Sequence, residues 1–69
     1  MSNIAIKLGD KIRKLREAKK LTQEDLAYHA SLDFSYINQI ENGKRNPTLN
    51  VLEQIAKALH ISLKELFSF

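Results

Sequence analysis

Apolar residues recur along the first third of the chain at the spacing of one helical face. The repeating positions are Ile4, Leu8, Ile12 and Leu15. Steps of four, four and three residues are typical of an amphipathic helix. The pattern predicts a first helix from Ile4 to Lys20, in which Gly9 is a weak position because glycine disfavours the helical conformation.

Two short helices joined by a tight turn are predicted in the middle of the chain. Thr22 is a suitable N-cap for a helix from Thr22 or Gln23 to Ala30, and Asp33 for one from Phe34 to Glu41 or Asn42. The turn between them has no glycine, so Ser31 is the candidate for a left-handed backbone. The positions available for close contact between the two helices are Leu26, Ala27, Ala30, Leu32, Ile37 and Ile40.

Two further helices are predicted after Pro47. Thr48 can cap a helix from about Leu49 to Leu59, with His60 at its end. Its expected inward face consists of Leu49, Leu52, Ile55, Ala56 and Leu59, while Val51 is less clearly assigned. Ser62 and Glu65 have the spacing of a capping box, which predicts a short helix at about residues 62–67. We therefore expect an all-α chain of five helices, forming one domain over residues 1–69.

Composition narrows the class of protein. The chain contains no cysteine, which excludes a disulfide framework or a thiolate metal site and makes an intracellular protein the simpler expectation. No run of about 18 apolar residues could span a membrane, and the first residues lack the apolar segment of a secretory signal. We expect a soluble cytoplasmic protein.

Eleven basic and eight acidic residues give a net charge of +3, which suits a polyanionic partner without requiring one. Seven of the bases precede Leu21: Lys7, Lys11, Arg13, Lys14, Arg16, Lys19 and Lys20. Lys44 and Arg45 follow the third predicted helix. A solvated helix face is the plainer explanation of the charge alone.

Groups for catalysis or metal binding are sparse. The two histidines, His29 and His60, both fall at predicted helix ends, and neither belongs to an H-x-x-x-H spacing with an adjoining carboxylate. A glycine-rich phosphate loop is also absent. We expect no enzymatic activity, no metal and no cofactor.

Several ordered motifs carry a family resemblance: LTQEDLA, SYINQIENGKRNPT, VLEQIAKAL and ISLKELF. They resemble the helix-turn-helix family of phage Cro and repressor proteins, often called XRE, over about residues 8–67. The resemblance implies a compact five-helix, lambda-repressor-like DNA-binding domain whose second and third helices form the helix-turn-helix. The segment EDLAYHASLDFSYI looks like the subgroup of restriction-modification controller proteins.

The resemblance also implies roles for individual residues. Gln23 matches a glutamine that holds a DNA phosphate at the start of the second helix. Phe34, Ser35 and Gln39 match positions that meet base edges, flanked by Tyr36 and Asn38. Gln39 can pair bidentately with adenine. Phe34 would pack on a thymine methyl or, alternatively, into the core, and Tyr36 has the same two alternatives.

Residues beyond the recognition helix complete the implied site. The loop residues Asn42, Lys44, Arg45 and Asn46 match positions that grip phosphates, and an arginine placed like Arg45 can also approach bases. A merely solvated basic loop is the alternative. Arg16 and Glu41 match a salt bridge between the first and third helices, which gives them a structural role.

A homodimer is expected because one short helix reads only a few base pairs, so two half-sites of a palindromic operator are needed. The expected interface consists of Val51, Ile61, Leu63, Leu66, Phe67 and Phe69, which is more apolar surface than a small core covers. The implied function is a transcription regulator of restriction-modification genes, in bacteria or encoded by a phage, with RNA polymerase as a further partner if it activates. The alternatives are a Cro-like phage or plasmid repressor and a protein-interaction module, such as an antitoxin or adaptor component.

Overall fold

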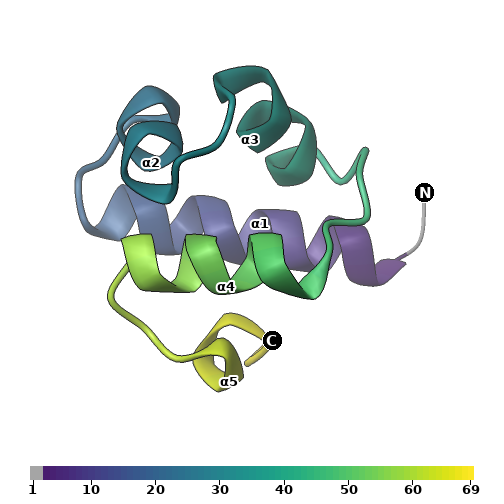
Figure 1. Ribbon diagram of the computed structural model, residues 1–69. Coiled ribbons are helices and arrows are strands. Elements are labelled where there is room, and N and C mark those ends of the chain that lie inside the picture. Colours follow the sequence, from purple (N-terminus) through teal and green to yellow (C-terminus); the bar gives the residue numbers. More distant parts are fainter. Residues whose placement is uncertain (1–2) are drawn as a thin grey trace.

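The computed structural model describes residues 3–69, and helices make up most of that span. The helices are α1 (Asn3–Ala18), α2 (Gln23–Ala30), α3 (Phe34–Glu41), α4 (Leu49–Ala58) and α5 (Leu63–Leu66). No strand occurs within residues 3–69. Figure 1 shows α2 and α3 above the long α1, with α4 across the front and α5 below it. The prediction of an all-α, five-helix fold is confirmed.

The helix starts follow the predicted capping residues, with one exception. Thr22 accepts a hydrogen bond from the Asp25 N–H at 3.0 Å and donates its own N–H to the Asp25 carboxylate at 2.9 Å. The backbone N–H of Thr22 lowers the pKa of Asp25. Thr48 and Ser62 cap α4 and α5 by accepting hydrogen bonds from the N–H groups of Val51 and Glu65 at 3.2 and 3.1 Å. Of the capping box predicted for Ser62 and Glu65, the structure shows this half. Asp33 occupies the N-cap position of α3, but its side chain makes no capping hydrogen bond, so that part of the prediction was wrong.

Three of the helices, α1, α2 and α4, are followed by a residue in the left-handed conformation that is not glycine. Ser31 has a φ of 58°, as predicted for the turn between α2 and α3, and His60 ends the segment after α4 with a φ of 57°. Lys20 has a φ of 60°. Because this conformation cannot continue a helix, α1 ends at Ala18, two residues before the predicted end.

The core lies where α1, α2, α3 and α4 meet, and α5 closes it from below. Its wholly buried side chains are Ile12, Leu26, Ile37, Ile40, Ile55, Leu59 and Leu66. Two assignments were wrong. Leu49 was expected on the inward face of α4 but is 74% exposed, because it is the first residue of that helix and no neighbouring element covers it. Leu66 was expected at a dimer interface but packs inside this chain.

A close approach between α1 and the end of α3 explains Gly9. A Cβ atom at Gly9 would lie 2.3 Å from the backbone oxygen of Ile40 and 2.7 Å from that of Glu41. Glycine at this position therefore lets the α1 backbone lie directly against α3, which outweighs its poor helix propensity.

We predict that Gly9→Ala destabilises the protein by about 1–3 kcal/mol, because the added methyl group meets main-chain atoms that cannot rotate away. This is the net loss of stability that remains after the gain of about 1 kcal/mol in helix propensity. Urea unfolding followed by circular dichroism measures the difference. Lys7→Ala, an exposed change on the same helix, should stay within about 0.5 kcal/mol of the parent. A more stable Gly9→Ala variant would contradict the prediction.

Candidate nucleic-acid interface

A buried ion pair joins α1 to the end of α3. Arg16 donates from Nε to Oε2 of Glu41 at 2.7 Å and from Nη2 to Oε1 at 3.0 Å. The two residues are only 8% and 2% exposed. Arg16 also donates to the Leu21 carbonyl at 2.7 Å, and the hydrogen bond with Glu41 raises the pKa of Arg16 further above its ordinary value. The structure thus brings together the two residues expected to form a salt bridge, and Arg16 stays charged.

Arg13 adds a contact that the sequence analysis did not foresee. Its Nη2 atom donates to the main-chain oxygen of Glu41 at 2.9 Å, one of the carbonyl groups that a helix end leaves without an intrahelical partner. Its Nε atom lies 3.9 Å from the Glu41 carboxylate. The last residue of α3 is therefore held from α1 through both its side chain and its main chain.

A chain of amide side chains continues from this ion pair across the face of α3. Gln23 donates from Nε2 to Oε1 of Glu41 at 2.9 Å. Asn38 donates to Oε1 of Gln23 at 3.1 Å, and Asn42 donates to Oδ1 of Asn38 at 3.3 Å. These bonds fix which way each amide points. The second N–H of the Gln23 amide is still available for an external acceptor such as a phosphate.

The outward side of α3 carries the residues expected to meet bases. Phe34 is 49% exposed, so of its two expected placements the structure shows the outward one. Ser35 is exposed and Gln39 is half-buried. Tyr36 is also half-buried and packs against the core, and the guanidinium of Arg45 lies 4.7 Å from the centre of its ring.

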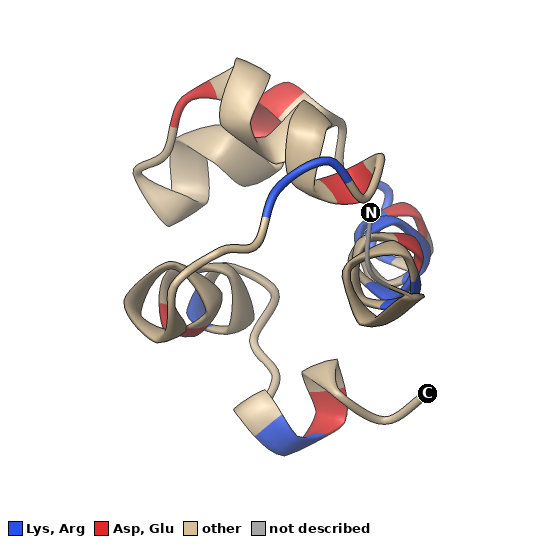
Figure 2. Ribbon diagram, turned by 90° about the vertical axis from the view of Figure 1, so that its right-hand side faces the viewer, with Lys and Arg blue, Asp and Glu red and all other residues tan. Residues whose placement is uncertain are grey.

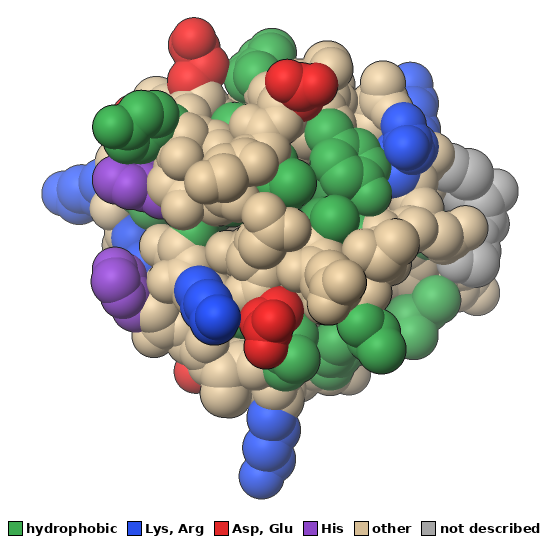
Figure 3. All heavy atoms as spheres, in the orientation of Figure 1, with side chains coloured by type: hydrophobic (Ala, Val, Ile, Leu, Met, Phe, Trp, Pro, Cys, Tyr) green, Lys and Arg blue, Asp and Glu red, His purple; other side chains and the backbone are tan. Residues whose placement is uncertain are grey.

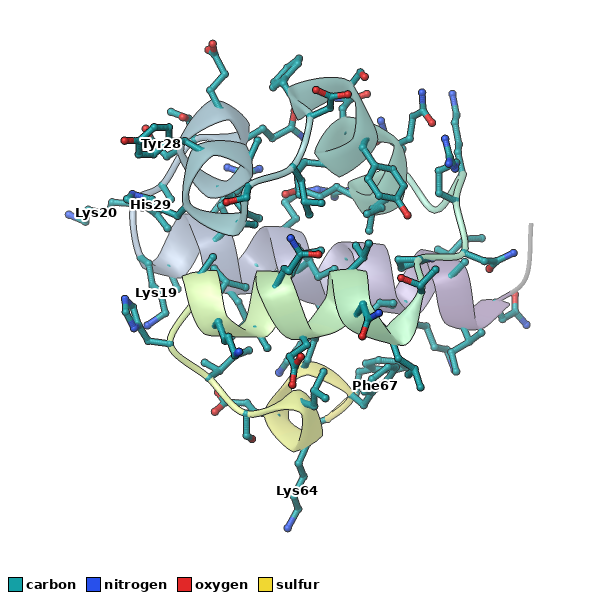
Figure 4. The ribbon with its side chains drawn as sticks, in the orientation of Figure 1. Lys19, Lys20, Tyr28, His29, Lys64 and Phe67 are labelled. Atoms are coloured by element: carbon teal, nitrogen blue, oxygen red, sulfur yellow. The ribbon has the colours of Figure 1, made fainter. Side chains whose placement is uncertain are left out.

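One open groove brings several of these side chains together. It is lined on the α3 side by Ser35, Tyr36 and Gln39, with Arg45 from the following loop. Tyr28 of α2 also lines this groove and is 81% exposed; Figure 4 labels it on the outer side of α2. The sequence analysis did not single out Tyr28, although a tyrosine outside the apolar spacing of a helix is a signal for a surface position.

The basic loop lies between α3 and α4, where Figure 2 shows it as a blue segment. It starts at Gly43, whose φ is 72° and which is packed so closely that a Cβ atom would lie 2.9 Å from the Ile6 side chain. Lys44, Arg45 and Asn46 are exposed, as is Asn42 just before them. Gln39 accepts a hydrogen bond from Arg45 Nη1 at 2.9 Å, so the loop contacts the face of α3.

The residues that the structure describes also bear on metal binding, on the two histidines and on membrane insertion. Residues 3–69 contain no group of three or more His, Cys, Asp or Glu side chains that could hold a metal ion. His29 and His60 are exposed, and Figure 3 shows the two histidines at the end of the molecule away from the N-terminus. Within the same residues, no helix has the length and apolar character needed to cross a bilayer.

A short helix that packs against α2 with one face and leaves the other face partly exposed, followed by a basic loop, is the arrangement of a helix-turn-helix protein. Comparison with known proteins agrees: a family model described as helix-turn-helix matches residues 12–66. The chain belongs to this family, as the resemblance to the XRE proteins implied.

Several similar proteins are control or controller proteins. Control protein C.MunI from Mycoplasma sp is 49% identical, and the alignment covers 99% of this chain and 93% of that protein. The crystal structure of the restriction-modification controller protein C.AhdI from Aeromonas hydrophila has a TM-score of 0.89 and 44% identity, covering 90% of this chain and 94% of that one. C.Esp1396I bound to a 25 base pair operator site has a TM-score of 0.88 and 41% identity, covering 97% and 92%.

We predict that Glu41→Ala lowers the free energy of unfolding by about 3–5 kcal/mol, because it leaves the buried guanidinium of Arg16 without its counter-ion. Chemical denaturation monitors the change, and in so small a domain it can remove the folded state entirely. The double variant Arg16→Met, Glu41→Leu should regain most of the loss, because no unpaired charge remains. A cost below about 1 kcal/mol for Glu41→Ala would show that the pair lacks the structural role assigned to it.

Proposed function

We propose that this chain is a sequence-specific transcription regulator of the restriction-modification controller type, which acts as a single DNA-binding domain and binds a palindromic operator as a homodimer. The observation that carries the proposal is the braced recognition surface. Glu41 is held by Arg16 and Arg13. The face that α3 then presents is at least partly exposed, carries polar side chains beside Phe34 and is bordered by a basic loop. The operator complex of C.Esp1396I, a relative with 41% identity, supports the same use of this fold.

The residues divide into three proposed roles on this surface. Ser35 and Gln39 read base edges, and Phe34 packs on a thymine methyl group, since its ring is exposed and cannot form hydrogen bonds. Gln23, with one free amide N–H at the start of α2, holds a phosphate. Phosphates are also gripped by the exposed loop and its approach, namely Asn42, Lys44, Arg45 and Asn46.

Two flanking residues, Tyr36 and Asn38, have proposed roles that follow from their contacts within the chain. Asn38 donates to Gln23 and accepts from Asn42, so it positions the phosphate-binding glutamine and does not read a base itself. Tyr36 packs partly on the core and supports the guanidinium of Arg45. Both residues are therefore assigned to shaping the recognition surface.

Dimerisation would use the apolar surface around α5 and the first half of α4. Leu63, Phe67 and Phe69 are 36%, 39% and 52% exposed, and Val51 and Ile61 are partly covered by their own chain. Figure 3 shows hydrophobic side chains gathered at the lower right of this face, and Figure 4 places Phe67 there, below the start of α4. Exposed Leu49 at 74% extends the surface, while buried Leu66 is left out of it.

The remaining assignments follow from the proposed function. Such a regulator acts by occupying its operator, needs no cofactor and catalyses no reaction. It works in the bacterial cytoplasm, where the DNA is, and an activating complex would bring RNA polymerase to the promoter as a further partner.

Selection of bound duplexes from a random pool tests the function and gives the operator. We expect two related half-sites about 34 Å apart along the DNA, as in other helix-turn-helix dimers. Within that operator, Gln39→Ala should change base preference at one position per half-site by about 1–3 kcal/mol. Lys44→Ala should weaken binding similarly on every sequence. Enrichment of no sequence would overturn the proposed function.

Salt dependence separates this function from the alternative of a protein-interaction module. Each neutralised phosphate contributes a slope of about −0.9 to the plot of log affinity against log salt concentration. A slope steeper than about −3 is expected for the parent, and Lys44→Ala should reduce it by about 1.

Analytical sedimentation tests the dimer. We predict that Leu63→Glu yields monomers at micromolar concentration, where the parent is dimeric, because a charge at this apolar position must be desolvated on association. In the measurements without DNA, Tyr28→Glu is a matched control, since it adds the same charge at an exposed ring on the opposite end of the molecule. A parent that remains monomeric both with and without operator DNA would remove the homodimer from the proposal.

A further inference from the structure

The side-chain oxygen of Gln39 is already occupied by a neighbouring residue. Nη1 of Arg45 donates to Oε1 of Gln39 at 2.9 Å. A guanidinium group carries five N–H donors and no acceptor. Only the oxygen of the Gln39 amide can therefore face Arg45, and the amide nitrogen with its two N–H groups must point elsewhere.

Arg45 is held over α3 by more than this one bond. Its guanidinium lies 4.7 Å from the ring centre of Tyr36, a cation–π contact that adds to the hydrogen bond. The loop that carries Arg45 is itself tied to α3, because Lys44 donates its N–H to the Gln39 main-chain oxygen at 2.9 Å and Gly43 donates to that of Ile40 at 3.0 Å. Arg45 is thus held through its side chain, and the two residues before it are held through their main chain.

This contact changes what Gln39 can offer to a base. A free glutamine presents one acceptor and one donor side by side, which match the N6 amino group and the N7 atom of adenine. The Gln39 oxygen keeps a second lone pair, but it is turned toward the cationic guanidinium of Arg45. The free groups that the two side chains offer together are therefore mainly N–H donors, from the Gln39 amide and from Arg45. The pair has the pattern that guanine requires, because O6 and N7 of guanine are both acceptors.

We propose that Gln39 and Arg45 act as one unit that reads guanine, and that Arg45 keeps its hold on the Gln39 oxygen in the DNA complex. Gln39 alone would select adenine. Arg45 changes this preference because its guanidinium holds the Gln39 oxygen toward itself. The inference rests on the proposed function, and it makes Arg45 a determinant of sequence preference as well as a contributor of charge.

Binding measurements on matched duplexes test the proposal. The position to examine is the one whose base preference disappears in Gln39→Ala. At that position we expect the parent to bind guanine about five- to 150-fold more tightly than adenine, the range of one good bidentate contact. Arg45→Ala should bind all duplexes more weakly and shift its preference toward adenine. Inosine in place of guanine should bind the parent equally well, since inosine keeps O6 and N7.

Lys44→Ala is the matched control for Arg45→Ala. Both variants lose one exposed positive charge from the same loop. The side chain of Arg45 bonds to the side chain of Gln39, whereas Lys44 contacts Gln39 through a main-chain hydrogen bond that an alanine would keep. Lys44→Ala should therefore weaken binding and leave the ratio of guanine to adenine affinity unchanged. The double variant Gln39→Ala, Arg45→Ala should show no preference at this position.

The possible outcomes distinguish failure of the Gln39–Arg45 pairing from failure of the proposed regulator function. Three outcomes would overturn the pairing of Gln39 with Arg45 while leaving the regulator function intact. The parent could prefer adenine, the preference for guanine could survive Arg45→Ala, or Gln39→Ala could keep the parent's base preference at every position. A parent that binds no DNA sequence selectively would overturn the proposed function itself. Both side chains lie at the surface, and the melting temperature of each variant verifies that it is folded.

Discussion

The carboxylate of Glu41 is the point on which the arrangement of the helices depends. It lies at the last residue of α3, is 2% exposed, and accepts hydrogen bonds from Arg16 and Gln23. One side chain thus ties α1, the start of α2 and the end of α3 together. Burying an ion pair to this degree costs desolvation energy, and in this chain the pair gives the groups around it a defined orientation. Glu41 orients Gln23 through a hydrogen bond, and Gln23 in turn orients Asn38.

The contact between α1 and the end of α3 is also fixed by close packing and by a second polar contact. Gly9 lets α1 lie against the final turn of α3, and Arg13 bonds to the main-chain oxygen of Glu41. The C-terminal half of α3 therefore cannot translate along α1 without losing contacts of both kinds. Gln39 lies in this fixed half, and the loop that follows it returns through Arg45 to the same residue. The geometry around Gln39 is therefore set by contacts within the chain itself.

Much of the fold could be predicted from the sequence, because helix caps and apolar spacing are local signals. Ser31 is an example, since the absence of a glycine in a tight turn left few residues to adopt the left-handed backbone. Leu49 and Leu66 were assigned wrongly, because helical spacing gives a direction but does not show which neighbour covers a given residue. The amide chain from Gln23 to Asn42 and the contact between Arg45 and Gln39 join residues from different elements, so no periodic pattern could have revealed them. The roles of the site residues toward DNA stay predictions.

The missing side-chain bond at Asp33 gives the two ends of α3 different freedom. An N-cap bond contributes about 1 kcal/mol to holding the first turn of a helix, and α3 lacks one, whereas its last residue is held by Arg13 and Arg16. Local opening of α3 should start at Phe34, whose amide should exchange hydrogen faster than that of Ile40. A single eight-residue helix therefore combines a first turn that can adjust its shape with a last turn whose position is fixed.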